Sequence, residues 1–286
     1  MKNIGVIGQG FVGSAIRAGL EPYYNMLTYD IDATKSNCQS LDEVVQNCDI
    51  IFQCLPTPMR KSGECDISIV EASLSKINEI CVTPGDNSVQ KKIVIIKSTV
   101  PPGTTRLLDS KFSNIDICFS PEFLTEANSF EDFKNQNRII IGGPRPATSV
   151  IKQMFRKAFP TIPIVKTGSD TAEMVKYFIN CFLATKVTFA NEMYDICQSH
   201  NIDMDKVTEY ALYDNRIGKS HLMVPGPDGD RGFGGHCFPK DLSAMIYFGS
   251  IAGVDTDFLE AVRDKNDKIR SNRDWEKMKG RAVSEE

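Results

Sequence analysis

A cysteine beside a glycine-rich loop is the residue of this sequence best suited to covalent chemistry. Cys237 lies within the segment GFGGHCFPKD at residues 232–241. The three glycines let the backbone approach a ligand and present amide N–H groups to it. Lys240 follows the thiol by three residues, and because a nearby cation favours the thiolate, Cys237 is a candidate nucleophile. Asp241 comes one residue later and could hold a neighbouring base or cation.

The other cysteines and the histidines carry no comparable signal. The chain has nine cysteines, and no two of them have the C-x-x-C spacing. A zinc ribbon or a disulfide framework does not fit that pattern, so we expect the other eight thiols to pack as small hydrophobic groups. A metal site on His236 and Cys237 would need a second Cys or His pair at ligand spacing. The sequence lacks such a pair, and His200 and His221 are isolated, so no metal is predicted.

Two further groups of polar side chains have spacings that suit catalysis. Lys176 and Asn180 are four residues apart in a helical pattern and therefore lie on one helix face. A solvated lysine and a surface asparagine are the ordinary interpretation, but the apolar residues beside them weaken it. The segment SPEFLTE at residues 120–126 places Glu122 and Glu126 at a strand end. A carboxylate there can activate water or hold a cofactor hydroxyl, and a helix N-cap is the alternative.

A turn near the N-terminus matches the motif that binds dinucleotides. The first glycine of such a motif makes a tight turn, the second admits the pyrophosphate and the third lets helix and strand pack closely. Asp30 closes the next predicted strand, and a carboxylate there binds ribose hydroxyls and repels a 2′-phosphate. We therefore favour NAD over NADP, although Lys35 is a cation that could accept a phosphate. The motif reads Gly8, Gln9, Gly10, Phe11, Val12 and Gly13.

The elements that must position these residues alternate over the first 165 residues. Short β-branched runs alternate with helix-like segments such as residues 11–20, and Pro, Gly, Ser or Thr follows most of the runs. This pattern is typical of a parallel sheet whose loops leave at the carboxyl ends of the strands, where ligands bind. The predicted strands are residues 4–7, 26–29, 49–54, 93–97, 115–119 and 138–141.

The pattern changes after Gly168. Residues 170–199 contain no Gly or Pro, and apolar residues recur at helical spacing, which predicts one long helix. Its stripe comprises Met174, Phe178, Cys181, Phe182, Thr185 and Phe189.

We therefore predict an α/β protein with two domains and a tail. A doubly wound Rossmann domain with a parallel sheet spans residues 1–168. A mainly helical central domain at residues 169–270 carries Cys237. The charged residues 271–286 are expected to fray.

Composition narrows the class of protein further. The 286 residues carry a net charge of −4, which argues against nucleic acid or an anionic membrane as the main partner. No apolar run approaches the roughly 18 residues of a membrane span. Glycine interrupts the N-terminal apolar run too early for a signal peptide. We expect a cytoplasmic protein with reduced thiols.

Together these segments resemble the UDP-glucose/GDP-mannose 6-dehydrogenase family, and within it the UDP-glucose 6-dehydrogenases. The resemblance runs in order from Lys2 to about Lys268. Besides the segments already described, it includes LPTP at 55–58, KSTVPPGTT at 97–105, EMVKYFIN at 173–180, NE at 191–192 and RIG at 216–218. Members of the family usually carry a further C-terminal domain that grips the nucleotide, so this chain resembles a short form.

The resemblance implies a four-electron oxidation of the C6 alcohol of a nucleotide sugar by two NAD, most simply UDP-glucose to UDP-glucuronate. Lys176 and Asn180 would stabilise oxyanions on the way to a cysteine thiohemiacetal and thioester. Glu122 would be the acid/base for thioester hydrolysis and Asp241 would position the water, with Thr99 on the cofactor side. The implied catalytic residues are Cys237, Lys176, Glu122, Asn180, Asp241 and Thr99.

The same resemblance implies the binding residues and a partner. His236 stands where the family usually has a small or uncharged residue, which would alter the pH dependence near Cys237. A homodimer is expected on the long helix, with Arg216 reaching across the interface. NAD would contact residues 8–13, Asp30, Lys35, Thr57, Thr99, Glu126 and Lys240. The nucleotide sugar would contact Phe123, Leu124, Lys176, Asn180, Arg216, Phe233 and Gly234.

Two other functions stay open at this point. A two-electron β-hydroxyacid-type dehydrogenase would need Lys176 and Asn180 but not Cys237. A non-catalytic protein that binds sugar nucleotides or NAD would need none of the three as a reactive group. The sequence does not select among UDP-glucose, GDP-mannose and N-acetylated sugars.

Overall fold

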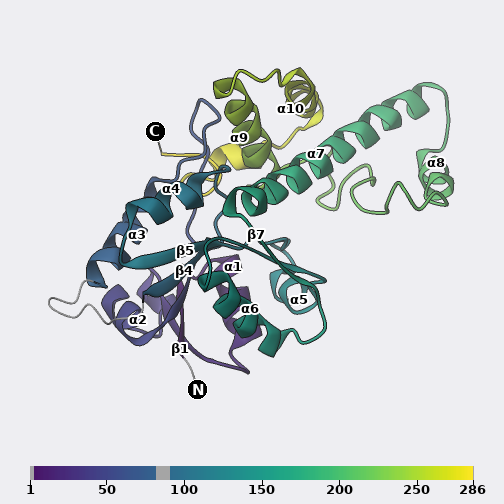
Figure 1. Ribbon diagram of the computed structural model, residues 1–286. Helices are drawn as coiled ribbons and strands as arrows, with labels where there is room; N and C mark the ends of the chain where they lie inside the picture. Colours follow the sequence, from purple (N-terminus) through teal and green to yellow (C-terminus); the bar gives the residue numbers. More distant parts are fainter. Residues whose placement is uncertain (1–2, 82–90, 286) are drawn as a thin grey trace. The chain divides into compact units, whose positions relative to one another are not determined.

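The first compact unit of the protein is built on a seven-stranded sheet (Figure 1). The computed structural model describes residues 3–81 and 91–285, so Lys2, where the resemblance begins, and Glu286 lie outside the described residues. The strand order is β2-β1-β3-β4-β5-β6-β7. The strands are β1 (Asn3–Ile7), β2 (Asn25–Tyr29), β3 (Ile50–Gln53), β4 (Lys92–Ile96), β5 (Ile115–Phe119), β6 (Ile139–Gly142) and β7 (Ile164–Thr167).

Helices cover both faces of this sheet, which confirms the predicted doubly wound fold. Side chains of β4 alternate between the faces: Ile93 and Ile95 join one hydrophobic core, and Val94 and Ile96 join the other. The first face is covered by α1 (Phe11–Leu20), α5 (Ser129–Lys134) and α6 (Ala147–Ala158). The second is covered by α2 (Leu41–Asn47), α3 (Ser68–Ile80) and α4 (Thr104–Lys111). The central strands β3 and β4 are therefore buried on both sides.

The edge of the sheet formed by β6 and β7 differs from the predicted parallel arrangement. β6 pairs with β5 in the antiparallel direction, through Phe119 and Gly142, whereas the other pairs are parallel. Consequently the chain re-enters the sheet beside the carboxyl end of β5. β7 was not among the predicted strands, because its sequence IVKT is short and its Val165 and Lys166 are exposed at the edge.

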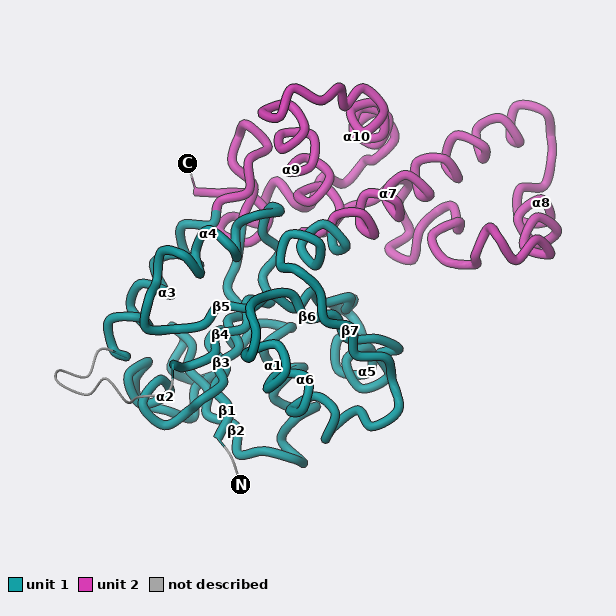
Figure 2. Tube along the Cα trace, in the orientation of Figure 1, with its two compact units in different colours: residues 1–57, 67–176 teal, residues 58–66, 177–286 magenta. Residues whose placement is uncertain are grey.

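One long helix links the two compact units (Figure 2). Helix α7 spans Ser169–Ser199, one residue longer than the predicted 170–199. The first unit comprises residues 1–57 and 67–176, and the second comprises residues 58–66 and 177–286. One boundary between these two compact units falls within α7, between Lys176 and Tyr177. No helix in the described ranges is both long and apolar enough to cross a membrane.

The second unit is mainly helical and has a small core. Besides its part of α7 it contains α8 (Met204–Ala211), α9 (Phe238–Ile251), α10 (Asp257–Ile269) and the 3-10 turn η2 (Asp274–Lys277). Cys181, Phe233, Leu242 and Val262 are among the residues that pack its core.

The C-terminal segment differs from the fraying tail that its charge predicts. Trp275 within η2 is only 4% exposed, and Ala282 is buried as well. Met59 donates its N–H to the carbonyl oxygen of Ala282, and Ser284 donates to that of Met59. These bonds place residues 58–66 in the second unit and hold the C-terminal segment against them. Burial of the Trp275 indole and these two backbone hydrogen bonds therefore order the segment, although most of its residues are polar.

Candidate functional site

The glycine motif of the first unit has the geometry that a dinucleotide requires. Gly8 has a φ of +88°, and a Cβ there would collide with the carbonyl oxygen of Cys54. A Cβ on Gly13 would collide with the carbonyl oxygen of Gly8, whereas a Cβ on Gly10 would meet no atom within 4 Å. Gly10 begins α1 and no side chain caps that end of the helix. The turn therefore leaves open space at Gly10, beside a helix N-terminus that favours an anion such as a pyrophosphate.

Asp30 lies beyond the end of β2, as the sequence predicts. Its Oδ2 accepts a hydrogen bond from the Gln9 N–H at 2.6 Å, and its Oδ1 accepts one from the Asp32 N–H at 2.9 Å. The carboxylate is thus fixed beside the glycine turn, with lone pairs left for ribose hydroxyls. Lys35 is exposed, and its ammonium lies 3.2 Å from Asp32, so a carboxylate already neutralises part of the cation that could have attracted a 2′-phosphate.

Two loops at the carboxyl ends of β3 and β4 are tied together. The Thr57 hydroxyl donates to the Thr99 carbonyl oxygen at 2.8 Å. The Ser98 hydroxyl donates to the Leu55 carbonyl oxygen at 2.6 Å and accepts from the Leu55 N–H at 3.0 Å. The predicted cofactor residues Thr57 and Thr99 therefore sit in one hydrogen-bonded pair of loops.

A buried ion pair follows β5. The Lys176 ammonium donates to Glu122 Oε1 at 2.7 Å and to the Glu122 carbonyl oxygen at 2.8 Å. Glu122 Oε2 accepts from the Leu124 N–H at 2.7 Å. Both side chains are more than nine-tenths buried. An ion pair so far from water is costly to desolvate, which is typical of a group kept for chemistry rather than for stability.

A cavity of about 270 Å³ adjoins this ion pair. Its lining includes Val12, Glu122, Phe123 and Leu124, and thus several residues that the sequence predicts as binding residues. Arg138, at the start of β6, also lines it, and its guanidinium lies 4.1 Å from the centre of the Phe123 ring. Sequence reasoning missed Arg138, because only the antiparallel direction of β6 brings it to this end of the sheet. Glu126, also predicted here, is exposed.

Lys97 and Glu173 were also missed as site residues. Lys97 is 6% exposed and lines the same cavity. Glu173 is fully buried, and it accepts hydrogen bonds from the N–H groups of Gly103 and Thr105 at the start of α4. Burial raises the pKa of Glu173, while the same hydrogen bonds act to lower it. A charged residue inside an apolar run is the signal that could have identified Lys97.

In the second unit, three predicted site residues form one hydrogen-bonded row. The Asn180 amide donates to Asp241 Oδ2 at 2.6 Å, and the Lys240 ammonium donates to Asp241 Oδ1 at 2.6 Å. All three side chains are buried. Burial is the largest single influence and would lower the pKa of Lys240, but the Asp241 carboxylate together with the nearby Cys65 and Cys237 thiols raises it above its ordinary value. The ammonium predicted to contact NAD thus has a partner inside its own unit.

Cys237 is half-buried at the N-terminal cap of α9. The Asp241 N–H donates to the Cys237 carbonyl oxygen at 2.8 Å, so the thiol begins the helix that carries Lys240 and Asp241. A helix N-terminus favours an anion, which suits a thiolate. By contrast, burial raises the pKa of Cys181 to about 12 and keeps that thiol protonated.

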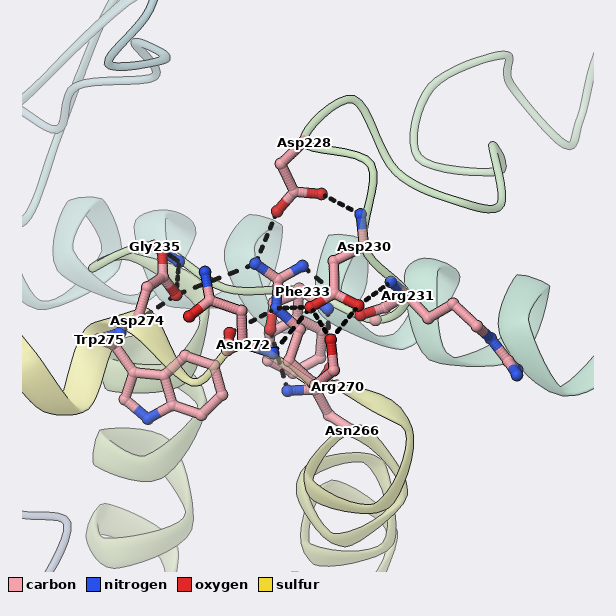
Figure 3. A network of polar contacts seen from close by, with 12 residues as sticks. Asp228, Asp230, Arg231, Phe233, Gly235, Asn266, Arg270, Asn272, Asp274 and Trp275 are labelled. Carbon is pink, nitrogen blue, oxygen red and sulfur yellow. Dashed lines mark hydrogen bonds and ion pairs between the residues drawn. The ribbon is translucent and has the colours of Figure 1, made fainter.

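The glycine loop before Cys237 is held by side chains from α10 and from the residues that follow it (Figure 3). The Asn266 amide group accepts from the Phe233 N–H at 2.7 Å and donates to the Phe233 carbonyl oxygen at 3.0 Å. The Gly235 N–H donates to Asp274 at 3.0 Å. A Cβ on Gly234 would lie too close to Arg270 and Asp274. Phe233 itself is buried, so the loop is a rigid support as well as a predicted substrate contact.

Arg270 is the centre of that support. Its side chain is 2% exposed and its guanidinium lies 2.6 Å from Asp228 and 3.5 Å from Asp230. Its Nε donates to the Asn272 carbonyl oxygen at 2.9 Å. Figure 3 shows the guanidinium surrounded by these carboxylates. In contrast, Arg216 is 90% exposed and pairs with Asp214 on the surface.

Comparisons with known proteins match two domain models of one family to this chain. The NAD-binding domain model of the UDP-glucose/GDP-mannose dehydrogenase family matches residues 34–159, and the model of its central domain matches residues 170–268. The chain is 33% identical over 94% of its length to the UDP-glucose 6-dehydrogenase TuaD of Bacillus subtilis, and it covers 64% of that protein. It is 30% identical over 92% of its length to the UDP-glucose 6-dehydrogenase AglM of Haloferax volcanii and covers 69% of it.

The same likeness extends to solved structures. A UDP-glucose dehydrogenase from the archaeon Pyrobaculum islandicum superposes with a TM-score of 0.83 at 28% identity, over 94% of this chain and 68% of that one. The chain thus spans about two thirds or less of the length of these first relatives. The family's NAD-binding domain identifies the cofactor as NAD. On the strength of these matches, the chain belongs to the UDP-glucose/GDP-mannose dehydrogenase family.

Proposed function

We propose that this chain carries the NAD-dependent, four-electron oxidation of the C6 alcohol of a nucleotide sugar, with UDP-glucose as the first substrate to test. The observation that supports this most is the buried Lys176–Glu122 pair, 2.7 Å apart, in the unit with the dinucleotide turn. A desolvated ammonium and carboxylate at the carboxyl edge of such a sheet suit proton transfer and oxyanion stabilisation. The names of the relatives favour the substrate class.

The proposed reaction has four steps. NAD, when bound, accepts a hydride at each of two oxidations. The alcohol loses a hydride and a proton to give the aldehyde. The Cys237 thiolate then adds to the aldehyde carbon while the carbonyl oxygen takes up a proton, which gives a thiohemiacetal. Loss of the second hydride and of the hydroxyl proton gives a thioester. Water cleaves the thioester, which releases the carboxylate and two protons and restores the Cys237 thiolate.

This chain's other residues have defined tasks in that proposal. The Lys176 ammonium stabilises the oxyanions, and the Asn180 amide adds a hydrogen bond. Glu122 takes the proton of the hydrolytic water, because its carboxylate is already aimed by the Leu124 N–H. Asp241, held by Lys240, positions that water. Thr99 lies on the cofactor side.

Phe123 and Leu124 line the cavity beside Glu122 and are the proposed sugar contacts. Phe233 and Gly234 are the contacts proposed for the second unit. Arg216, exposed in one chain, is proposed to serve the site of a second copy.

The number of NADH formed per sugar, measured with a panel of sugar nucleotides, tests the proposal. We expect UDP-glucose to yield two NADH per sugar, measured as absorbance at limiting substrate, together with a sugar acid identified by mass spectrometry. One NADH per sugar, with an aldehyde or ketone as product, would instead indicate a two-electron dehydrogenase. Binding of a sugar nucleotide with no turnover of any panel member would contradict the proposal and favour a non-catalytic binding protein.

We further propose a homodimer built on α7. Phe178, Phe182, Phe189 and Ile196 recur along one face of the helix, and each is between 47% and 70% exposed. Aromatic side chains at that spacing form an apolar surface that a second copy would cover. The expected result is a dimer by light scattering at micromolar concentration, and a monomer for the double variant Phe182→Glu/Phe189→Glu.

A matched control separates this from a general effect of surface charge. Leu107 is 63% exposed on α4 in the first unit, and Leu107→Glu should leave the dimer intact. A wild-type monomer, or a double variant that remains dimeric, would refute the proposed interface.

A further inference from the structure

Lys97 is a buried cation that the proposed reaction does not use. It follows β4, in which four consecutive side chains are fully or almost fully buried and apolar. The Lys97 ammonium lies 3.0 Å from the carbonyl oxygen of Pro121 and 3.4 Å from the Ser120 hydroxyl. It thus reaches from the end of one strand to the turn that follows the neighbouring strand, β5.

The contacts of Lys97 and Lys176 fall on consecutive residues of that turn. Lys97 holds the carbonyl of Pro121, and Lys176 holds the carbonyl of Glu122 together with its carboxylate. The remaining carboxylate oxygen accepts from Leu124. Two ammonium groups and one amide therefore fix the direction in which the Glu122 carboxylate points.

The choice of a charged donor at this position is informative. A neutral hydroxyl or amide could hold a carbonyl without the cost of burying an ammonium. Burial lowers the pKa of Lys97 to about 8, and the charge of Lys176 acts in the same direction. The groups that face it from the adjoining elements are Cys54 after β3, Glu122 after β5 and Lys176 on α7. Of these, Glu122 is the carboxylate that favours a charged Lys97.

We propose that Lys97 is a positioning residue for the oxidation: its ammonium holds the turn at residues 120–122 so that Glu122 is aimed at Lys176, and its charge supports the ionised carboxylate. Lys97 does not touch the reacting atoms. The inference rests on the proposed function for its kinetic consequence, but the contact itself belongs to the protein without substrate.

Kinetics of two variants test the positioning role. Lys97→Met keeps the length of the side chain and removes the charge, so kcat should fall about 10–100-fold, as expected for a misaimed catalytic group, with little change in KM for NAD. In wild type, kcat should decline above pH 8 as Lys97 loses its proton. Lys97→Arg keeps a charge at every accessible pH, so this decline should move to higher pH. Lys91→Met is the matched control, because Lys91 is exposed before β4, and its kinetics should be unchanged.

A measurement without substrate separates this inference from the proposed function. In lysine-labelled protein, NMR of the ammonium nitrogen should show Lys97 titrating near pH 8, and Glu122→Gln should lower that midpoint. If no sugar nucleotide is oxidised but this coupling is present, the proposed reaction fails and the Lys97–Glu122 contact stands. A midpoint that Glu122→Gln does not move, or a Lys97→Met enzyme with wild-type kcat and pH profile, would overturn the inference.

Discussion

Cys237→Ser is expected to lower steady-state NADH formation from the sugar nucleotide by on the order of 10³-fold or more, the scale seen when a covalent nucleophile is removed. A serine hydroxyl can add to an aldehyde, but its oxygen ester is reached and cleaved far less readily than a thioester. Stopped-flow measurement should show at most one NADH per active site before turnover stalls. The initial hydride transfer is expected to survive, because it needs Lys176 but not the thiol.

Cys181→Ala is the control for a non-specific effect of losing a thiol. Cys181 is buried in the core of the same unit, and the high pKa that burial gives it leaves no thiolate at neutral pH. Its replacement should leave the number of NADH per sugar at two. Full turnover by Cys237→Ser would refute the thioester mechanism and favour a two-electron reaction.

Arg270→Met should destabilise the protein by about 3–5 kcal/mol, the usual cost of removing one partner from a buried ionic network. The variant leaves Asp228, Asp230 and Asp274 near one another without their shared cation. It also removes the hydrogen bond that Arg270 donates to the Asn272 carbonyl oxygen and the contact of its guanidinium with the Arg231 carbonyl oxygen before the glycine loop. Urea unfolding followed by circular dichroism measures the change.

Arg263→Met is the matched control for Arg270→Met. Arg263 lies on α10 and its side chain is 38% exposed beside Asp264, so its replacement should cost less than about 1 kcal/mol. Equal stability of the two variants would show that the network around Arg270 contributes no more than a surface ion pair.

The pH dependence of that network has a definite sign. Hydrogen bonds from the Asn272 and Arg231 N–H groups and the nearby Arg270 charge lower the pKa of Asp230 to about 2, below its ordinary 3.8. A carboxylate whose pKa is lower in the folded state stabilises the fold above its unfolded pKa. Its contribution is therefore complete above about pH 4 and is lost as the pH falls through about 2. Arg270→Met should show a smaller loss over that window.

Local patterns predicted most of the first unit. The helix at residues 11–20 was predicted with the bounds that α1 has, and the strand at 115–119 coincides with β5. Both segments have a regular pattern of apolar residues and are bounded by residues that favour turns. Their structure is therefore decided by nearby residues. β7 has neither a strong period nor full burial, and its place depends on pairing with β6.

Long-range pairing explains what the sequence could not predict about the second unit. Residues 58–66 belong to it because Met59 pairs with residues more than 200 positions later. The chemically important residue types were recognised from their spacing. The sequence predicted that Asp241 could hold a neighbouring base or cation, but it did not predict which one. Lys240 on α9 and Asn180 on α7 both contact this carboxylate.

The interleaving of the two units along the chain constrains how the protein can be divided. Because residues 58–66 sit in the second unit, the polypeptide passes between the units three times, after residues 57, 66 and 176. The second unit is therefore not encoded by one continuous stretch of the gene. A fragment that starts at Tyr177 lacks Met59, which forms backbone hydrogen bonds with Ala282 and Ser284. A separately expressed second unit must therefore also include residues 58–66.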